Sequence, residues 1–359
     1  MPRGIVVSLA AVAGLGWLLL SAPTIRAADT EDVKFETYDR VEIKGIFYPG
    51  KKSEPCVLIL PKYGTSYKDD DWDKLALALQ KTGCAVLMFD YRGHGDSTTI
   101  KKPEKFWEDH ENRAGVRGYD PRKLKSELAT KDFTREYLPH LVNDLEAARL
   151  FLDRKNDAGQ CNSRAIVTIS AEDGGVLGAM WAYSEMYRFR EKKGGKLPDP
   201  EGSDLLGSVW LTPTSKLGTK ETEQNTQALA WLTDVGAPAP AHNLPMAFFY
   251  GGNDTAGKNF ANSAFKAVRP QKDNKVTLEH VIKDTNLKGS KLLDNQLSTQ
   301  DDIVTYIDGL KKAKSVAEWD SKDTKKNQYW WILKGTTTAL PAKDADEDYF
   351  DRVPMIMLR

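Results

Sequence analysis

Short apolar runs alternate with amphipathic segments along most of this chain. The continuous runs Cys56–Leu60 and Ala85–Phe89 predict strands that are covered on both faces. Between them, apolar residues recur at the i, i+3, i+4 and i+7 spacing of one helix face, which predicts a helix over 71–81. A strand, a helix and a second strand in this order form a right-handed βαβ unit. The pattern therefore predicts a parallel sheet with helices on its faces.

The same sheet pattern continues on both sides of this unit. Alternating polar and apolar residues over 32–47 predict an antiparallel hairpin at the start of the sheet. Further apolar runs predict strands at 165–169, 205–211, 246–250 and 275–282. A last amphipathic segment predicts a closing helix that ends near Leu310.

The segment 165–179, AIVTISAEDGGVLGA, combines a strand rich in β-branched residues with a tight turn and an apolar helix. This is the pattern of a nucleophile elbow, G-x-S-x-G, in which a strained turn requires small neighbours on both sides. Counting from Gly174 and Gly175 puts Glu172 in the nucleophile position. The other register, with Ser170 as nucleophile, is disfavoured because it places Glu172 where a small residue is needed.

Two further motifs stand in the order expected around such an elbow. The turn DYRGHGDS at 90–97 follows a predicted strand, and Tyr63 and Gly64 follow the strand before it. Over 33–310 the chain resembles the α/β-hydrolase superfamily, in particular its dienelactone hydrolase and serine aminopeptidase-like branch. Many members carry D-x-R-G-x-G-x-S at the first motif and His-Gly beside the oxyanion hole at the second. The resemblance implies an α/β fold with a mostly parallel central sheet of about eight strands flanked by helices.

The same resemblance implies the positions of a catalytic triad. The acid commonly follows the strand at 246–250, where Asp254 stands, and the histidine follows the last strand, where IKDTNLKGSKLL puts Asn286. A serine hydrolase needs a hydroxyl nucleophile and an imidazole base. Glu172 and Asn286 supply neither group, so the triad Glu172, Asp254 and Asn286 is expected to be degenerate.

A binding or structural role is therefore the leading hypothesis, with an unidentified small-molecule or peptide ligand. The residues expected to bind it are Lys62, Tyr63, Gly64 and Asp173. Glu172 is predicted to contact Lys62 or the amides of its own helix. The alternative is an active hydrolase of ester or amide bonds, in which Glu172 and Asp254 perform acid–base chemistry or hold a cation. A carboxylate nucleophile, as in related epoxide hydrolases and dehalogenases, still requires a histidine.

Of the five histidines, His94, His110, His140, His242 and His280, only His110 could be brought to the vacant base position, by a cap. His94 belongs to the RGHG turn, and His140 and His280 lie in a predicted helix and strand, where a structural role is expected. His110 lies in a charged insertion at 98–134, which is longer than ordinary connections. This insertion is either a small cap over the site, from which His110 could reach it, or a solvated excursion remote from it.

Composition and the amino terminus narrow the function classes. Lys+Arg and Asp+Glu both number 51 in 359 residues, so no net field favours nucleic acid. Residues 1–27 have the basic start, apolar run and small-residue end of a signal peptide, with cleavage after Ala27. An uncleaved anchor is the competing interpretation, but the run is short and is broken by Gly14 and Gly16. We expect export to the periplasm or the exterior, with no membrane span after cleavage.

The remaining chain is predicted to hold a hydrolase-like domain at 28–313 and an accessory extension at 314–359. Within the extension, QYWWIL at 328–333 predicts an added strand. The three cysteines, each at or just before a predicted strand, are Cys56, Cys84 and Cys161. Either one disulfide or three partly buried thiols is compatible with them. Their spacing does not resemble a zinc site, and no metal or cofactor is expected.

Overall fold

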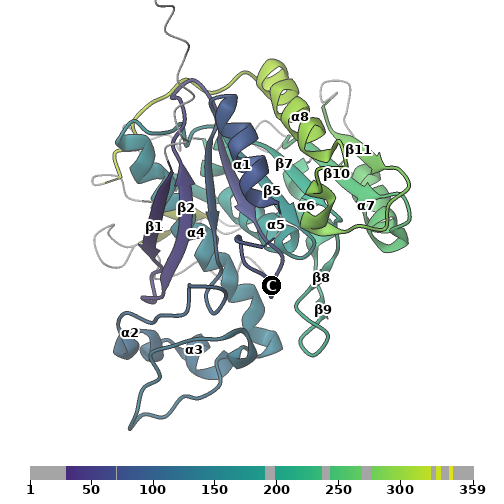
Figure 1. Ribbon diagram of the computed structural model, residues 1–359. Helices are drawn as coiled ribbons and strands as arrows, with labels where there is room; N and C mark the ends of the chain where they lie inside the picture. The colour runs from purple at the N-terminus through teal and green to yellow at the C-terminus, as the bar shows by residue number, and fades with distance from the viewer. Residues whose placement is uncertain are drawn as a thin grey trace, which may run out of the picture.

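A computed structural model describes residues 30–69, 71–190, 199–236, 243–268, 276–324, 329–332 and 339–342 of the chain. A mixed eight-stranded sheet runs through its middle (Figure 1). In spatial order its strands are β1 (Glu31–Glu36), β2 (Glu42–Tyr48), β4 (Ala85–Phe89), β3 (Cys56–Leu60), β5 (Ile166–Ala171), β7 (Leu205–Leu211), β10 (Met246–Gly251) and β11 (Leu278–Ile282). β2 pairs antiparallel with β1 and β4, and the other neighbours pair in parallel. β11 is shorter than predicted, because residues 276–277 precede it outside the ladder.

Helices cover both faces of the sheet (Figure 1). One face carries α1 (Trp72–Lys81) and α8 (Thr299–Lys314). The other face carries α4 (Val142–Asp157), α5 (Gly174–Glu185), α6 (Ala228–Gly236) and α7 (Thr255–Ala267). Each helix buries an apolar face against the sheet, as α1 does with Trp72, Leu75 and Leu79. The chain therefore has the predicted α/β-hydrolase fold, and the loops at the carboxyl ends of the parallel strands lie together at one edge of the sheet.

Two excursions lie at this carboxyl edge of the sheet (Figure 1). The predicted insertion at 98–134 contains three short elements and leads into a fourth. These elements are α2 (Pro103–Glu108), α3 (His110–Gly115), η1 (Thr130–Asp132) and η2 (Arg135–Leu141). The second excursion, after β7, forms a small hairpin from β8 (Lys216–Leu217) and β9 (Gln224–Asn225).

Arg92, in the turn after β4, connects the first excursion to the sheet. Its guanidinium is wholly buried and donates to Asp39 in the β1–β2 turn at 2.6 Å and to Asp144 of α4 at 2.8 Å. It also donates to the Tyr137 hydroxyl at 2.8 Å, and Asn112 of α3 donates to Asp39 at 3.0 Å. Buried charges are tolerated only when they are fully paired. The network therefore determines where the insertion lies on the domain.

The described part of the C-terminal extension packs on α4 and on η3 (Glu201–Asp204). Lys322 is wholly buried and pairs with Glu201 at 3.2 Å and with Asp204. Asp157 of α4 accepts backbone N–H bonds from Lys322 at 2.7 Å and Thr324 at 2.9 Å. A three-stranded sheet beyond it contains β13 (Ala339–Ala342), β12 (Tyr329–Ile332) and β6 (Arg188–Arg190). β12 confirms the strand predicted from QYWWIL.

Cys56, Cys84 and Cys161 are free and buried. The protein thus has three buried thiols here and no disulfide among them. Burial raises the pKa of the Cys84 thiol to about 11, which keeps it in the unreactive protonated form.

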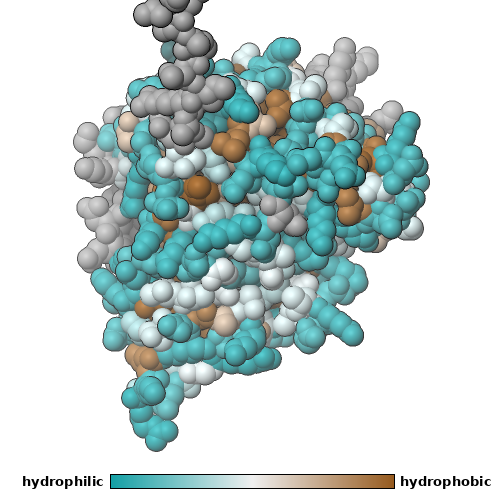
Figure 2. Space-filling model, in the orientation of Figure 1, coloured by the Kyte–Doolittle hydropathy of each residue, from teal (hydrophilic) through white to brown (hydrophobic). Residues whose placement is uncertain are grey.

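The surface is mainly polar on the face that Figure 2 shows, with apolar residues scattered singly. Large apolar side chains that are exposed in the described part include Tyr119, Leu229 and Val281, which come from separate elements. The predicted signal peptide lies outside the described residues. Among those that are described, we find no helix with the length and apolar character needed to cross a bilayer.

Replacing Arg92 with Met is expected to lower the free energy of unfolding by about 3–5 kcal/mol, because Asp39 and Asp144 stay buried without their counter-ion. Urea unfolding at pH 7 measures the change. Arg122→Met is the matched control, since Arg122 belongs to the same insertion and its side chain is 90% exposed. The control should change the unfolding free energy by less than about 0.5 kcal/mol, and equal losses in both variants would contradict the role given to Arg92.

Candidate active-site cavity

The turn from β5 to α5 holds Glu172 in the left-handed region, with φ 45°. Residues other than glycine rarely adopt this conformation and do so under strain. The glycines that follow allow the helix to begin unusually close to its neighbours. A Cβ on Gly174 would lie 2.3 Å from the Pro61 carbonyl oxygen, and one on Gly175 would lie 2.5 Å from the Trp210 ring. The turn therefore places the Glu172 side chain at the carboxyl edge of the sheet.

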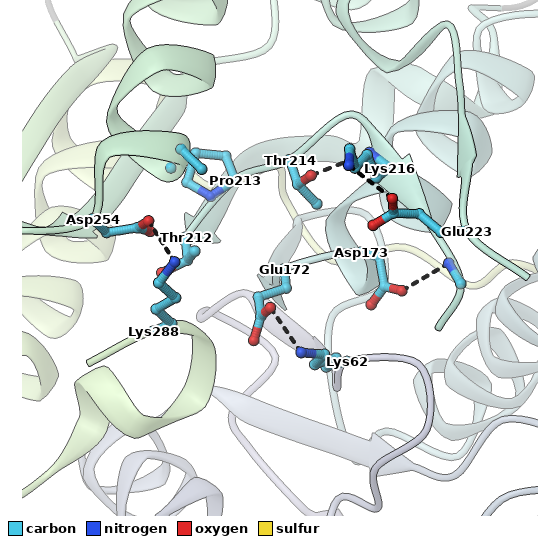
Figure 3. A pocket seen from close by; sticks show the side chains of 13 residues that line it. Lys62, Glu172, Asp173, Thr212, Pro213, Thr214, Lys216, Glu223, Asp254 and Lys288 are labelled. Carbon is cyan, nitrogen blue, oxygen red and sulfur yellow. Dashed lines mark hydrogen bonds and ion pairs between the residues drawn. The ribbon is translucent and has the colours of Figure 1, made fainter. Parts of the chain in front are cut away.

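A cavity of about 190 Å³ lies beside Glu172 (Figure 3). Its walls come from the loops after β3, β5, β7, β10 and β11 and from the β8–β9 hairpin. The charged residues that line it are Lys62, Glu172, Asp173, Lys216, Glu223, Asp254 and Lys288. The lining is therefore rich in charged groups of both signs.

Lys62 pairs with Glu172 across one wall of the cavity. The Lys62 ammonium donates to the Glu172 carboxylate at 2.8 Å, and the two side chains are 42% and 25% exposed. The predicted contact between Glu172 and Lys62 is thus confirmed. Because both groups are partly solvated, the pair contributes little to stability, but it directs the carboxylate toward the loop after β3.

Asp173 lies beneath the same turn and bonds two backbone amides. It is 3% exposed, and its carboxylate oxygens accept the Tyr63 N–H at 2.9 Å and the Gly218 N–H at 3.1 Å. Burial raises the pKa of Asp173 to about 6, although both amides and Lys62 oppose the shift. Tyr63 thus contributes a backbone amide and does not line the cavity, nor does Gly64.

Asp254 and Lys288 form the opposite wall. Asp254 follows β10, its side chain is wholly buried, and the Lys288 ammonium lies 2.8 Å from its Oδ1. This is a charge contact, because no hydrogen bond of good geometry from the described residues reaches either oxygen. Asn286 is exposed, accepts the Asn253 side-chain amide at 3.4 Å and does not line the cavity. The structure thus brings Asp254 and Glu172 to one cavity together with Lys288, and leaves Asn286 outside it.

His94 supports the loop after β3 from behind. Its Nε2 accepts the Gly64 N–H at 2.8 Å, so the Nδ1 proton faces the Arg92 carbonyl oxygen at 2.9 Å. Burial lowers the pKa of His94, which favours this neutral tautomer. The expected structural role of His94 agrees with this geometry.

Ser170 and three further histidines do not line the cavity. His110 is exposed at the start of α3, and no residue of the 98–134 insertion lines the cavity. Ser170 is buried within β5 and donates to a carbonyl oxygen of β7 at 3.2 Å. His140 stacks on an aromatic ring of η2, and His280 packs against one of β10.

The carboxylates of the cavity have lysine or amide partners. Lys216 pairs with Glu223 at 2.7 Å within the hairpin, in addition to the two lysine pairs described above (Figure 3). In the part of the chain that the structure describes, no group of three or more His, Cys, Asp or Glu side chains is arranged to hold a metal ion. The cavity is therefore a polar site in which charges of both signs alternate.

The sheet and the β5–α5 turn define this chain as an α/β-hydrolase-fold protein. No protein-family profile matches its sequence. A search of curated proteins also finds no match. Similar solved structures include a Pyrococcus furiosus esterase, with TM-score 0.48 and 15% identity over 79% of this chain and 90% of the other. A dienelactone hydrolase from Anabaena variabilis has TM-score 0.47 and 14% identity over 79% and 96%. The α/β hydrolase GrgF from Penicillium sp. has TM-score 0.49 and 12% identity over 79% and 98%.

Gly175→Ala is expected to lower the free energy of unfolding by about 1–3 kcal/mol, because the added methyl group overlaps the Trp210 ring. Gly309→Ala in α8 is the control, since the nearest atom to its added Cβ lies 3.9 Å away on Val276. The control should raise the unfolding free energy by about 0.4–1 kcal/mol. Urea unfolding compares the two, and a stabilised Gly175→Ala would contradict the close packing at the turn.

Proposed function

We propose that this chain is an exported α/β-hydrolase-fold protein that binds a small polar ligand and lacks standard serine-hydrolase activity. The observation that carries the proposal is Glu172, which holds the strained turn where the fold places its nucleophile. A carboxylate in an ion pair with Lys62 offers no hydroxyl group for acyl transfer.

The groups around Glu172 support the same conclusion. In this fold one oxyanion donor is a backbone N–H of the loop after the third strand. The Tyr63 N–H belongs to that loop. It donates to Asp173, so it is not free to stabilise an oxyanion. A negative carboxylate at that position also repels a developing oxyanion.

The base position is altered as well. We assign it to Lys288, because this residue faces Asp254 as an imidazole would face the acid of a triad. An ammonium group has three donors and no acceptor, so it cannot take a proton from a nucleophile. With Glu172 as nucleophile and no imidazole, an ester intermediate would have no general base for its hydrolysis.

The cavity itself indicates the class of ligand. Its lining of lysines and carboxylates favours a small molecule that carries charge, or the charged end of a peptide. We expect a bound ligand to exchange one of the lysine–carboxylate contacts for its own groups, since these pairs are partly solvated.

Hydrolase assays test the catalytic half of the proposal. The purified protein is expected to show no turnover of short acyl esters or peptides above that of Glu172→Ala. Turnover that Glu172→Ala abolishes would overturn the proposal in favour of an unconventional hydrolase.

A gain-of-function series tests the assigned positions. Glu172→Ser with Lys288→His and Asp173→Ala restores a hydroxyl group, an imidazole beside Asp254 and a free Tyr63 amide. It is expected to release a burst of p-nitrophenol from p-nitrophenyl acetate, with acylation at position 172. The matched control replaces Lys288→His with Asn286→His, and a burst in the control alone would contradict the assignment of Lys288.

Binding assays test the second part of the proposal, that the cavity binds a small polar ligand. Small zwitterions and dicarboxylates, screened by thermal shift and then by calorimetry, are the probes. A ligand of the cavity should lose at least about tenfold in affinity with Lys62→Met, the loss of one charge-assisted hydrogen bond. Lys105→Met, whose side chain is 63% exposed on α2, should leave the affinity unchanged. A ligand that is insensitive to Lys62→Met would place binding elsewhere.

Export is testable from the mature amino terminus. The proposal rests on the signal-peptide pattern of residues 1–27 and predicts a chain that begins at Ala28. Mass spectrometry of protein recovered from the periplasm or medium measures the terminus, and residues 1–27 retained in a cytoplasmic fraction would contradict it.

A further inference from the structure

Asp254 is the most deeply buried of the carboxylates that line the cavity. Its side chain is wholly buried, whereas Asp173, Glu172 and Glu223 are more exposed. It stands at the N-cap position of α7, yet its carboxylate accepts no capping hydrogen bond. No donor among the described residues bonds either of its oxygens with good geometry. Buried carboxylates ordinarily accept several hydrogen bonds, so Asp254 retains an acceptor capacity that the fold does not use.

The three lysines of the cavity differ in how they contact their carboxylates. Lys62 and Lys216 each donate a hydrogen bond to their partner, at 2.8 Å and 2.7 Å. Lys288 lies 2.8 Å from the Oδ1 atom of Asp254, but the angles of this contact are not those of a hydrogen bond. Figure 3 shows it reaching Asp254 apart from the two other pairs, and its side chain is 49% exposed. Asp254 therefore has the counter-ion that is held least firmly.

The backbone beside Lys288 is fixed by its own contacts. The Gly289 N–H donates to Thr212 Oγ1 at 2.9 Å, and Thr212 is held at φ 55°, a conformation that β-branched residues rarely adopt. A Cβ on Gly289 would lie 2.8 Å from Glu172 Oε1, so the loop packs directly against that carboxylate. This fixed backbone sets the direction from which Lys288 reaches Asp254, a restriction that does not apply to a ligand.

The summed charge of the lining favours a cation as well. Four carboxylates and three lysines line the cavity, the acids being Glu172, Asp173, Glu223 and Asp254. When all seven groups are charged, the lining carries one negative charge in excess. A ligand with a single positive charge neutralises this excess, whereas an anion increases it.

We propose that Asp254 binds a primary ammonium group of the ligand, which takes the place of Lys288 on this carboxylate. The inference rests on the proposed binding function and names the chemical class of the ligand. That class is a primary amine, either a free small molecule or the amino end of a peptide.

The exchange keeps a counter-ion beside Asp254. Loss of Lys288 alone would leave an isolated buried anion, whereas replacement of one ammonium by another leaves the charge paired. Oδ2 faces α7, where a Cβ on Gly257 would lie 2.3 Å from it, so Oδ1 is the oxygen that a ligand can reach. An ammonium group has three donors, and a ligand can direct one of them at Oδ1 while Lys288 is released to water. We expect this charge-assisted hydrogen bond to raise the affinity at least about tenfold.

Matched probes test the class of ligand on the purified protein. Glycinamide and glycylglycine carry a primary ammonium group, and glycolamide and glycolylglycine have a neutral hydroxyl group in its place. Calorimetry at pH 7 is expected to show binding of at least one ammonium probe and at least about tenfold weaker binding of its hydroxyl partner. Binding of glycylglycine without glycinamide would indicate the amino end of a peptide.

The two proposals fail in different ways. Equal or tighter binding of the hydroxyl probes, or binding of dicarboxylates alone, would overturn the ammonium site and leave the proposed binding function standing. Absence of binding by every amine, zwitterion and dicarboxylate would overturn both.

Asp254→Asn tests the carboxylate, since it keeps the shape of the side chain and removes its charge. It should weaken the binding of the ammonium probe at least about tenfold. Glu223→Gln is the matched control, because it makes the same change in a carboxylate that already has a hydrogen-bonded lysine. The control should weaken binding by less than about threefold, and equal losses in the two variants would contradict the assignment to Asp254.

Lys288→Met tests the exchange, because it removes the competing ammonium group. Binding of the ammonium probe should become about tenfold tighter, whereas Lys216→Met, the same change of charge in another pair, should alter it by less than about threefold. If the unpaired Asp254 unfolds Lys288→Met, glycinamide should restore its thermal transition and glycolamide should not. Unchanged or weaker binding in Lys288→Met, or equal effects of the two probes on its folding, would contradict the exchange.

Discussion

The left-handed turn at Glu172 is the constraint on which the site depends. A strand that ends in this conformation delivers the next helix at a sharp angle, and only small residues fit where that helix meets the loop after β3 and the ring of Trp210. The two side chains of the turn then have separate environments. Glu172 lies in the partly solvated cavity, whereas Asp173 is buried against backbone amides. The strained turn thus carries two adjacent carboxylates in different surroundings.

Two carboxylates of the cavity, Glu172 and Asp254, each have a lysine as counter-ion. Asp254 is wholly buried, so Lys288 supplies the positive charge that keeps it from being an isolated anion. Lys62 does the same for Glu172 at a more solvated position. Changing one member of such a pair leaves the other uncompensated, which makes the set interdependent even where each contact contributes little. The arrangement suits the exchange of polar groups with a ligand better than the movement of a proton between neutral groups.

The ion pairs of Arg92 with Asp39 and Asp144 are the same kind of interaction in a place from which water is excluded. Their charges lie on three elements far apart in the sequence, and their burial makes each hydrogen bond necessary. The Arg92 network positions the 98–134 insertion, which contributes no residue to the cavity. The ion pairs of Arg92 are fully buried, whereas Lys62–Glu172 and Lys216–Glu223 in the cavity are partly exposed to water.

The sequence pattern predicted the strands of the central sheet and the turn, but not helix α6 or the β8–β9 hairpin. The βαβ unit, the elbow and the added strand β12 follow from periodicity and glycine placement, because these signals act over a few residues. The contact of Lys62 with Glu172 was also predictable, since both loops end neighbouring strands. Only the tertiary structure decided that Lys288 faces Asp254 while Asn286 points to solvent. It likewise brought Lys216 and Glu223 to the cavity. Which residue of a loop turns inward depends on long-range packing, which spacing along the chain does not encode.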